Sequence, residues 1–281
     1  MSQPFSAWQR GLRQPNLLVG MLLSSCLLLC ALLSLIWTPW DPYAMNMDAK
    51  LLLPDSRHWL GTDAFGRDVL SQLMVGARSS IAVGVIAVGI GLVFGVALGL
   101  LASALRGWVE AVIMRLSDFT FAFPAILLAI MMTAVFGPSM VNAIIAIGIF
   151  NIPTFARITR ASANAIWTRE YITAARACGK NRFSITFQHV LPNIMGVLIV
   201  QATIQFALAI LAEAALSYLG LGTQPPQPSW GRMLSDAQTL MFQAPLLAIF
   251  PGVAIALSVL GLNLLGDGLR DLLDPRLHRQ R

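Results

Sequence analysis

Long runs of apolar residues without charge recur along the chain, and they restrict it to one class of fold. Only 11% of the 281 residues are charged, whereas soluble domains carry about 25%. A run of about 20 apolar residues can cross a bilayer as a helix. Six runs are present, at residues 17–37, 81–105, 119–136, 140–155, 194–219 and 246–265, of which the third and fourth are short. The sequence therefore predicts a single all-α, polytopic membrane domain over residues 1–281 with six transmembrane helices.

The distribution of lysine and arginine predicts how these helices are oriented, because both residues gather in cytoplasmic segments. With the N-terminus inside, the inner segments hold Arg10, Arg13, Arg106, Arg115, Arg157, Arg160, Arg169, Arg176, Lys180, Arg182, Arg270, Arg276, Arg279 and Arg281. The outer segments hold only Lys50, Arg57, Arg67, Arg78 and Arg232. We expect a multi-pass protein of a bacterial cytoplasmic (inner) membrane with both termini in the cytoplasm. The same bias accounts for the net charge of +6 without a nucleic acid partner.

Two local patterns concern how the runs pack. The residues Gly-Pro-Ser at 137–139 favour a tight turn that makes the third and fourth runs an antiparallel hairpin. If this turn is buried, the two runs form a re-entrant pair and the number of spans falls. In the second run, Gly91, Gly95 and Gly99 form a smooth ridge on one helix face. Packing within the bundle is the favoured interpretation of this ridge, and a position near the pathway or a subunit interface is the alternative.

A polar and basic stretch, residues 170–193, separates the fourth run from the fifth within a cytoplasmic segment of about 157–192. The residues that share one face at helical spacing are Tyr171, Ala174 or Ala175, and Cys178. Gly179 is placed to end this helix, and Pro192 marks the start of the next apolar run. The small alanine side chains would let another protein come close to the backbone. From the residues alone, a short amphipathic helix on the membrane surface is an equal alternative.

Several kinds of chemistry are missing from the sequence. No G-x-x-x-x-G-K-[S/T] motif occurs, so any ATP-derived energy has to come from a partner. The three histidines, His58, His189 and His278, are scattered, and the three cysteines, Cys26, Cys30 and Cys178, have no metal-ligand spacing. No pair of nucleophile and base stands out. We therefore expect no enzyme activity, no metal site and no cofactor bound by this chain.

The fifth run carries the few polar side chains that could line a pathway or an outer gate. Gln201 and Gln205 share one helix face, and Glu213 lies further toward the outer end. For the glutamines the alternative is hydrogen bonding between helices, and for Glu213 a structural hydrogen bond is favoured. Ionisable residues lie only toward the ends of the runs, which argues against an autonomous proton-coupled carrier.

The outer segments contain two shaped, polar stretches. The first includes Gly61, Asp63, Arg67 and Asp68, whose pattern suggests turns before a short helix. The second, residues 220–231, holds too many prolines and glycines for one helix and is expected to precede an amphipathic helix that runs through Ala237.

The stretch 170–193 resembles the EAA loop of ABC importer permeases, whose form is Glu-Ala-Ala, three residues, Gly, nine residues, Ile, any residue, Leu-Pro. The matching positions are Ala174, Ala175, Gly179, Leu191 and Pro192, whereas Thr173 and His189 replace the Glu and the Ile. Three further stretches, HWLGTDAFGRDVLSQLMVGAR, EAALSYLGLGTQPPQPSWGRML and GDGLRDLLDPR, are similar to signatures of the C-type permease of the peptide/nickel family. The four matches lie in order across nearly the whole chain.

This resemblance implies a type I importer permease that pairs with a homologous second permease. Two separate subunits would bind ATP and Mg²⁺, and a substrate-binding protein would deliver the solute from outside. The coupling set of this chain would be Tyr171, Ala174, Ala175, Cys178, Gly179, Leu191 and Pro192. Candidates for docking the binding protein are Gly61, Asp63, Arg67, Asp68, Pro225 and Trp230. The implied solutes are di- and oligopeptides, with nickel or metal-chelate complexes as the alternative and an autonomous secondary carrier as a more distant one.

Overall fold

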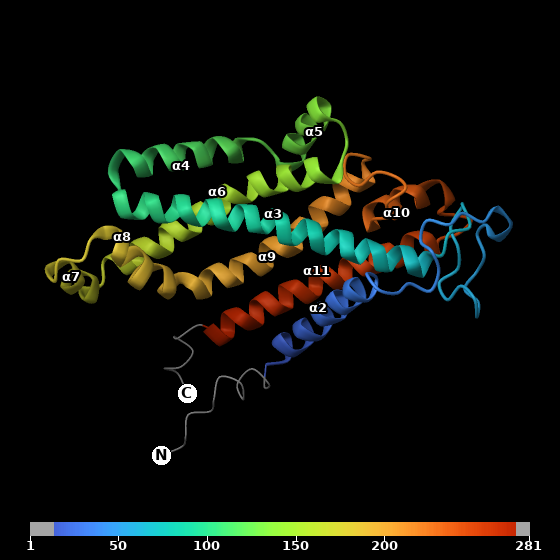
Figure 1. The fold of residues 1–281 in the computed structure, drawn as a ribbon, viewed down its shortest axis with the longest axis horizontal. Helices are drawn as coiled ribbons and strands as arrows, with labels where there is room; N and C mark the ends of the chain where they lie inside the picture. Colours follow the sequence, from blue (N-terminus) through green and yellow to red (C-terminus); the bar gives the residue numbers. More distant parts are fainter. Residues whose placement is uncertain (1–13, 274–281) are drawn as a thin grey trace, which may run out of the picture.

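The computed structural model describes residues 14–273, which form a bundle of helices elongated along one axis (Figure 1). The helices are α2 (Pro15–Leu33), α3 (Val69–Leu105), α4 (Gly107–Ala122), α5 (Ala125–Phe136), α6 (Met140–Trp167), α7 (Glu170–Ala177), α8 (Arg182–Ile185), α9 (Leu191–Tyr218), α10 (Trp230–Ala237) and α11 (Leu246–Leu273). Short 3₁₀ turns lie at Met47–Ala49 and Gln238–Leu240, and a π-helical turn lies at Thr186–Val190. Between residues 14 and 273 there is no β-strand, which confirms the all-α prediction.

Five segments of the described chain are long and apolar enough to cross a membrane. They are α2, α3, α6, the continuous segment Arg182–Tyr218 and α11. The pair α4 and α5 makes a sixth only if it is counted as one span, because the two helices meet at 82°. The apolar run at 119–136 is therefore not one continuous helix but is divided between the end of α4 and α5. Pro124 lies at the break, where its ring and missing N–H are incompatible with a continuous helix.

Two spans are longer than the sequence predicts. α3 begins well before residue 81, and α6 continues beyond residue 155 to Trp167. Arg157 and Arg160, expected in a loop, lie inside α6 and bind α4. Arg160 Nη1 lies 2.7 Å from Glu110 Oε1, and Arg157 pairs with Asp118. These ion pairs hold α4 against α6.

α3 and α6 form the most extensive contact between two helices, and the glycine ridge lies within it. A Cβ atom on Gly91 would lie 2.4 Å from Asn151 Cβ, and one on Gly95 would lie 2.5 Å from the Ile152 carbonyl oxygen. On Gly99 it would lie 2.6 Å from the Ala156 carbonyl oxygen. The ridge therefore lets α3 and α6 pack closely within the bundle, which was the favoured interpretation of the three glycines.

The turn at 137–139 joins α5 and α6 as predicted. Gly137 has a φ of +82°, and the Ser139 side chain caps α6 by accepting a hydrogen bond from the Asn142 N–H. Pro138 is exposed, so the turn is not buried within this chain. With 12 residues, α5 is about 18 Å long and cannot cross a bilayer alone.

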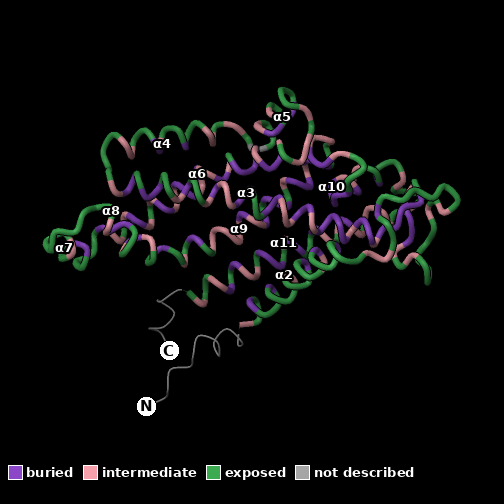
Figure 2. Tube along the Cα trace, in the orientation of Figure 1, coloured by how far each residue is buried: buried purple, intermediate pink, exposed green. Residues whose placement is uncertain are grey.

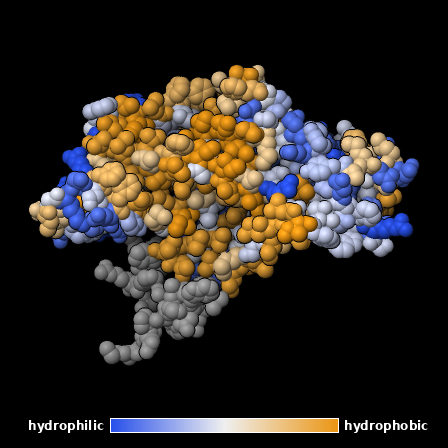
Figure 3. Space-filling model, viewed as in Figure 1, coloured by the Kyte–Doolittle hydropathy of each residue, from blue (hydrophilic) through white to orange (hydrophobic). Residues whose placement is uncertain are grey.

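The two ends of the bundle differ in character. The end that holds α7 and α8, here the α7 end, lies opposite the loops 34–68 and 219–245, here the loop end (Figure 1). α2 begins and α11 ends on the side nearer α7. Buried residues run along α3 and α6, whereas α4 and α7 are mostly exposed (Figure 2). Hydrophobic residues cover the middle of the face in Figure 3, with hydrophilic residues at both extremes, as expected for a lipid-facing band.

Candidate functional site

The helix α7 at the α7 end coincides with the stretch that the sequence singled out. Glu170 lies in its first turn and Arg176 in its last, an arrangement that complements the helix dipole. Gly179 ends it with a φ of +81°, while the Gly179 and Lys180 N–H groups donate to the carbonyls of Arg176 and Ala175 at 2.9 and 3.1 Å. This pair of hydrogen bonds is a Schellman motif, which explains the glycine at this position.

One apolar side chain and two ring contacts fix α7 to the bundle. Ile172 is fully buried in the main hydrophobic cluster of the protein. The guanidinium of Arg176 lies 5.0 Å from the centre of the Trp167 ring, and the rings of Tyr171 and His189 are 6.3 Å apart. Sequence reasoning missed Ile172 as the anchor, although an isolated isoleucine in a polar helix is a readable signal.

The predicted coupling residues divide into two groups. Tyr171, Ala174, Cys178, Gly179 and Pro192 are exposed. Ala175 and Leu191 are half-buried and pack against the main cluster. The face that α7 presents to a partner is therefore built around Ala174, whereas Ala175 faces partly inward.

After α7, the chain returns to the bundle as one long segment. Asn181 caps α8 by accepting from the Ser184 N–H, and the π-helical turn then leads into α9. Within that turn the Leu191 N–H donates to the Thr186 carbonyl, just before Pro192, which has no N–H to donate. Arg182 Nη1 donates to the Ala104 carbonyl at 3.0 Å. The end of α3 is thereby tied directly to the start of this segment.

Two exposed aromatic rings lie beside α7, and the sequence analysis did not single them out. Phe183 and Phe187 are 74% and 50% exposed, with ring centres 4.7 Å apart. Their spacing of four residues in a helix was the available signal. They form an exposed apolar pair on α8 and the π-helical turn.

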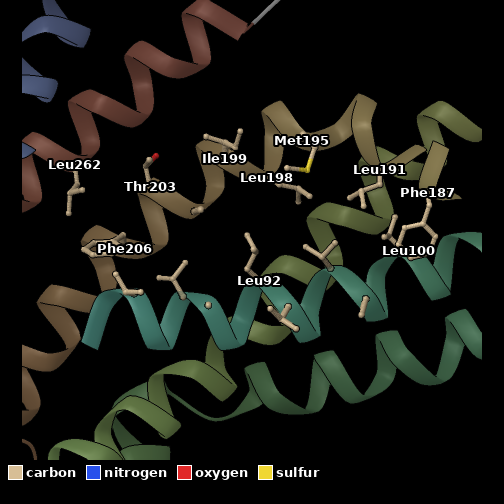
Figure 4. Close-up of a pocket in the computed structure, with 17 residues that line it drawn as sticks. Leu92, Leu100, Phe187, Leu191, Met195, Leu198, Ile199, Thr203, Phe206 and Leu262 are labelled. Carbon is tan, nitrogen blue, oxygen red and sulfur yellow. The ribbon is translucent and has the colours of Figure 1, made fainter. Parts of the chain in front are cut away.

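A groove of about 730 Å³ runs between α3 and α9 (Figure 4). From α3 it is lined by residues such as Leu92 and Leu100, and from α9 by Met195, Leu198 and Phe206. Thr203 is the one polar side chain among its lining residues in the described chain. The groove lies in the apolar part of the bundle and suits apolar contacts, with little capacity to hold a charged group.

The three pathway candidates do not line this groove. Gln205 is buried and Gln201 is half-buried, and neither is among the groove-lining residues. Glu213 is fully buried, and its Oε1 accepts hydrogen bonds from Ser217 Oγ at 2.6 Å and Thr223 Oγ1 at 3.4 Å. The structural hydrogen bond that the sequence favoured for Glu213 is present.

At the loop end, Asp63 and Arg67 form the centre of a charged network. Arg67 Nε lies 2.7 Å from Asp63 Oδ2, and Gln72 Nε2 donates to the same oxygen at 3.0 Å. Asp236 from α10 pairs with Arg232 at 3.0 Å and lies 3.9 Å from Arg67. Partial burial raises the pKa of the Asp236 carboxyl above its ordinary value, and the charges of Arg232 and Arg67 offset part of that rise.

Asp68 begins α3 and organises the neighbouring loop. Its Oδ2 accepts from the Ser71 N–H and hydroxyl at 2.8 and 2.7 Å, which makes it the N-cap, and its Oδ1 lies 2.9 Å from His58 Nδ1. Gly61 has a φ of +77°, and a Cβ there would lie 2.4 Å from the Leu52 carbonyl oxygen. Trp230 is buried and donates from Nε1 to the Leu73 carbonyl at 3.0 Å.

The structure shows which residues of the predicted docking set are accessible. Gly61, Arg67, Asp68 and Trp230 are buried against this chain's own residues, and Asp63 is half-buried. Charged loop residues were expected to face outward, but here they form ion pairs and hydrogen bonds within the loop, and Asp68 caps α3. Of the set, Pro225 alone is exposed. The predicted helix through Ala237 is α10.

Comparisons with known proteins agree on one family. Residues 72–279 match the model for "Binding-protein-dependent transport system inner membrane component". The chain is 43% identical to a dipeptide transport system permease protein of Alkalihalophilus pseudofirmus, over 97% of this chain and 91% of the relative. It is 44% identical to a di/tripeptide transport system permease protein of Pseudomonas aeruginosa, over 96% and 91%. It is 43% identical to a glutathione transport system permease protein of Pectobacterium atrosepticum, over 96% and 90%.

A solved structure supports the same fold. The chain resembles a chain of the MetNI methionine ABC transporter in an inward-facing conformation, with a TM-score of 0.62 and 19% identity over 72% of this chain and 97% of that one. The helices, the α7 segment and nearly full-length sequence similarity point the same way. The chain belongs to the family of inner membrane components of binding-protein-dependent transport systems.

Proposed function

We propose that this chain is one of two permease subunits of an ATP-driven importer whose solutes are short peptides. The relatives at 43% and 44% identity are named for dipeptide, di/tripeptide and glutathione transport, and this supports peptides over nickel or metal chelates. A homologous second permease would complete the pathway. A binding protein would deliver the solute, and two separate subunits would hold ATP and Mg²⁺ and hydrolyse the ATP.

The orientation follows from charge. In this proposal α7 is cytoplasmic, because α7, α8 and the turn between them carry Arg176, Lys180 and Arg182, and basic residues gather on the cytoplasmic side. Both termini are assigned to the same side from the distribution of lysine and arginine along the sequence. The loop end then faces outward, toward the binding protein. There, exposed Pro225 and its neighbour Gln227 are the candidates for contact.

α7 is the proposed contact with the ATP-hydrolysing subunits. Its exposed face is small at Ala174 and flanked by Tyr171 and Cys178, so a partner surface could approach the backbone closely. Ile172 and the ring contacts fix α7 to the ends of α6 and α9, so a displacement of α7 is passed to both helices.

The groove between α3 and α9 is the proposed boundary with the second permease. It is open and almost wholly apolar, and it lies within a helix pair long enough to span the membrane. Helix surfaces of this kind pack against a neighbouring subunit through van der Waals contact.

Charge at Ala174 tests the coupling surface. In Ala174→Glu, an unpaired carboxylate would enter a close interface, which costs several kcal/mol. The variant should insert normally but lose co-purification of the ATP-hydrolysing subunits and ATP-dependent peptide uptake. Ala174→Ser keeps the residue small and uncharged and is the matched control. Uptake by a stably inserted Ala174→Glu protein at the wild-type rate would remove α7 from the interface.

A further inference from the structure

A carboxylate surrounded by hydroxyl groups lies buried where α9 meets the loop end. Glu213 and its neighbours Ser217, Thr223, Ser229 and Ser80 are each 0% exposed. They come from α9, from the loop after it, from the start of α10 and from α3. None of the ion pairs among residues 14–273 includes Glu213, and the side chains around its carboxylate are these neutral hydroxyls.

The hydrogen bonds show which oxygens are already used. Ser217 Oγ donates to Glu213 Oε1 and accepts from the Thr223 N–H at 3.0 Å. Thr223 Oγ1 donates to the same Oε1. Ser229 Oγ accepts from the Arg232 N–H at 3.2 Å. Oε1 therefore accepts hydrogen bonds from two sides, so both of its lone pairs are in use.

Two buried oxygens at this cluster are left over. Glu213 Oε2 and Ser80 Oγ have no hydrogen-bond partner among residues 14–273, although Ser80 and Ser229 both lie near the carboxylate. An unsatisfied polar atom of this kind in a buried site calls for a bound water, ion or other explanation. A buried carboxyl group either takes up a proton or, when ionised, is paired with a positive charge or a metal ion.

We propose that this cluster binds one monovalent cation, with Na⁺ as the physiological ligand. A single carboxylate matches the charge of one monovalent ion, and carboxylate and hydroxyl oxygens are the hard ligands that such cations take. Glu213 Oε2 and Ser80 Oγ supply the free oxygens, and Thr223 and Ser229 Oγ complete the oxygen-rich wall. A divalent ion is disfavoured because one carboxylate leaves its second charge unbalanced.

The bound ion would join three parts of the chain. It would connect α3 through Ser80, α9 through Glu213 and the loop after α9 through Thr223 and Ser229. The order of that loop, on the side expected to face the binding protein, would then depend on Na⁺.

The test measures thermal unfolding of the full-length chain, purified with its partner subunits in nanodiscs, in NaCl or choline chloride at equal ionic strength. At about ten times the dissociation constant, Na⁺ should raise the Tm by about 3–6 °C in a saturable way. Ser80→Ala removes one ligand and should increase the half-saturating Na⁺ concentration about tenfold or more. Ser103→Ala is the matched control, because Ser103 is a buried serine of the same helix whose hydroxyl already donates to the Leu100 carbonyl.

Glu213→Gln should abolish the Na⁺ response while keeping the shape of the side chain. If that variant does not fold, Ser80→Ala alone still decides. A Tm that is the same in NaCl and choline chloride, or that follows pH alone, would overturn the proposal and assign a proton to the carboxylate. An Na⁺ response that is unchanged in Ser80→Ala would place the ion elsewhere in the complex. Because the readout is stability, the result does not depend on whether peptides are the solute.

Discussion

The contact between α3 and α6 allows a sharp prediction at Gly95. In Gly95→Ala the added Cβ would lie 2.5 Å from the Ile152 carbonyl oxygen and 2.6 Å from Phe155 Cβ, whereas ordinary contacts are 3.4–4 Å. The carbonyl belongs to the backbone of α6, so no rotamer change can relieve the overlap. The two helices would have to separate by about 1 Å, and overpacking of this kind costs about 1–3 kcal/mol.

Replacing glycine by alanine also stabilises the helix itself, which opposes the loss from overpacking. Alanine is favoured over glycine inside a helix by about 1 kcal/mol. The net loss in Gly95→Ala is therefore about 0–2 kcal/mol, and the single variant does not isolate the packing term. Gly89 lies in the same helix, and no atom of a neighbouring residue lies within 4 Å of the place that a Cβ would take there, so Gly89→Ala carries the helix preference alone. The difference between the two variants should be about 1–3 kcal/mol.

Thermal unfolding of the purified chain in detergent, followed by circular dichroism, measures that difference. At about 2–4 °C per kcal/mol, Gly95→Ala should unfold about 2–12 °C below Gly89→Ala. Equal Tm values for the two variants would refute the close approach of α3 and α6 at this position. A Gly89→Ala protein less stable than wild type would refute the open space beside Gly89.

Three further predictions follow from the site. An impermeant thiol reagent applied to intact cells should leave Cys178 unlabelled but should label a cysteine introduced at Gln227, which is an exposed position of the loop end, unlike the buried Ser229. Labelling of Cys178 from outside would invert the orientation. Trp230→Ala should lower the free energy of unfolding by about 3–5 kcal/mol, measured by denaturant titration, because it leaves a cavity and removes the hydrogen bond from Trp230 Nε1 to the Leu73 carbonyl; a loss below about 1 kcal/mol would contradict this packing. Calorimetry on the permease pair without binding protein or nucleotide should show no peptide binding tighter than about −5 to −6 kcal/mol, because a pathway at the boundary with the second permease would receive only one polar side chain, Thr203, from the groove between α3 and α9; submicromolar binding would reveal a dedicated site.

Hydropathy and helix-ending residues predicted much of the fold. The apolar runs at 81–105 and 194–219 lie within or nearly within α3 and α9, and Gly179 ends α7 as expected. The break between α4 and α5 was missed because average hydropathy does not register a single residue, although Pro124 was a readable signal. The extension of α6 through Arg157 and Arg160 was missed for a different reason. The carboxylates that pair with them come from α4, and such partners are found only in the folded protein.

The site was predicted less evenly. The spacing of Ala174 and Ala175 placed both on α7, but only tertiary packing shows that Ala175 turns partly inward. Arg67 and Asp68 were expected to face a partner because charged loop residues are usually exposed. They are buried because the folded loop supplies their partners: Arg67 pairs with Asp63 and lies near Asp236, and Asp68 binds His58 and Ser71. The sequence does not show the contact of Arg67 with Asp236, because the two residues lie far apart along the chain.

The length of α3 has a mechanical consequence. Its 37 residues make a rod of about 55 Å, against a hydrocarbon core of about 30 Å. The rod is clamped along α6 by glycines, begins at the Asp68 network and ends beside Arg182. If it pivots by about 10° at mid-membrane, its two tips swing in opposite directions by about 5 Å each. A lever of this kind makes opening on one side of the membrane and closing on the other a single motion, without any signal having to travel from residue to residue.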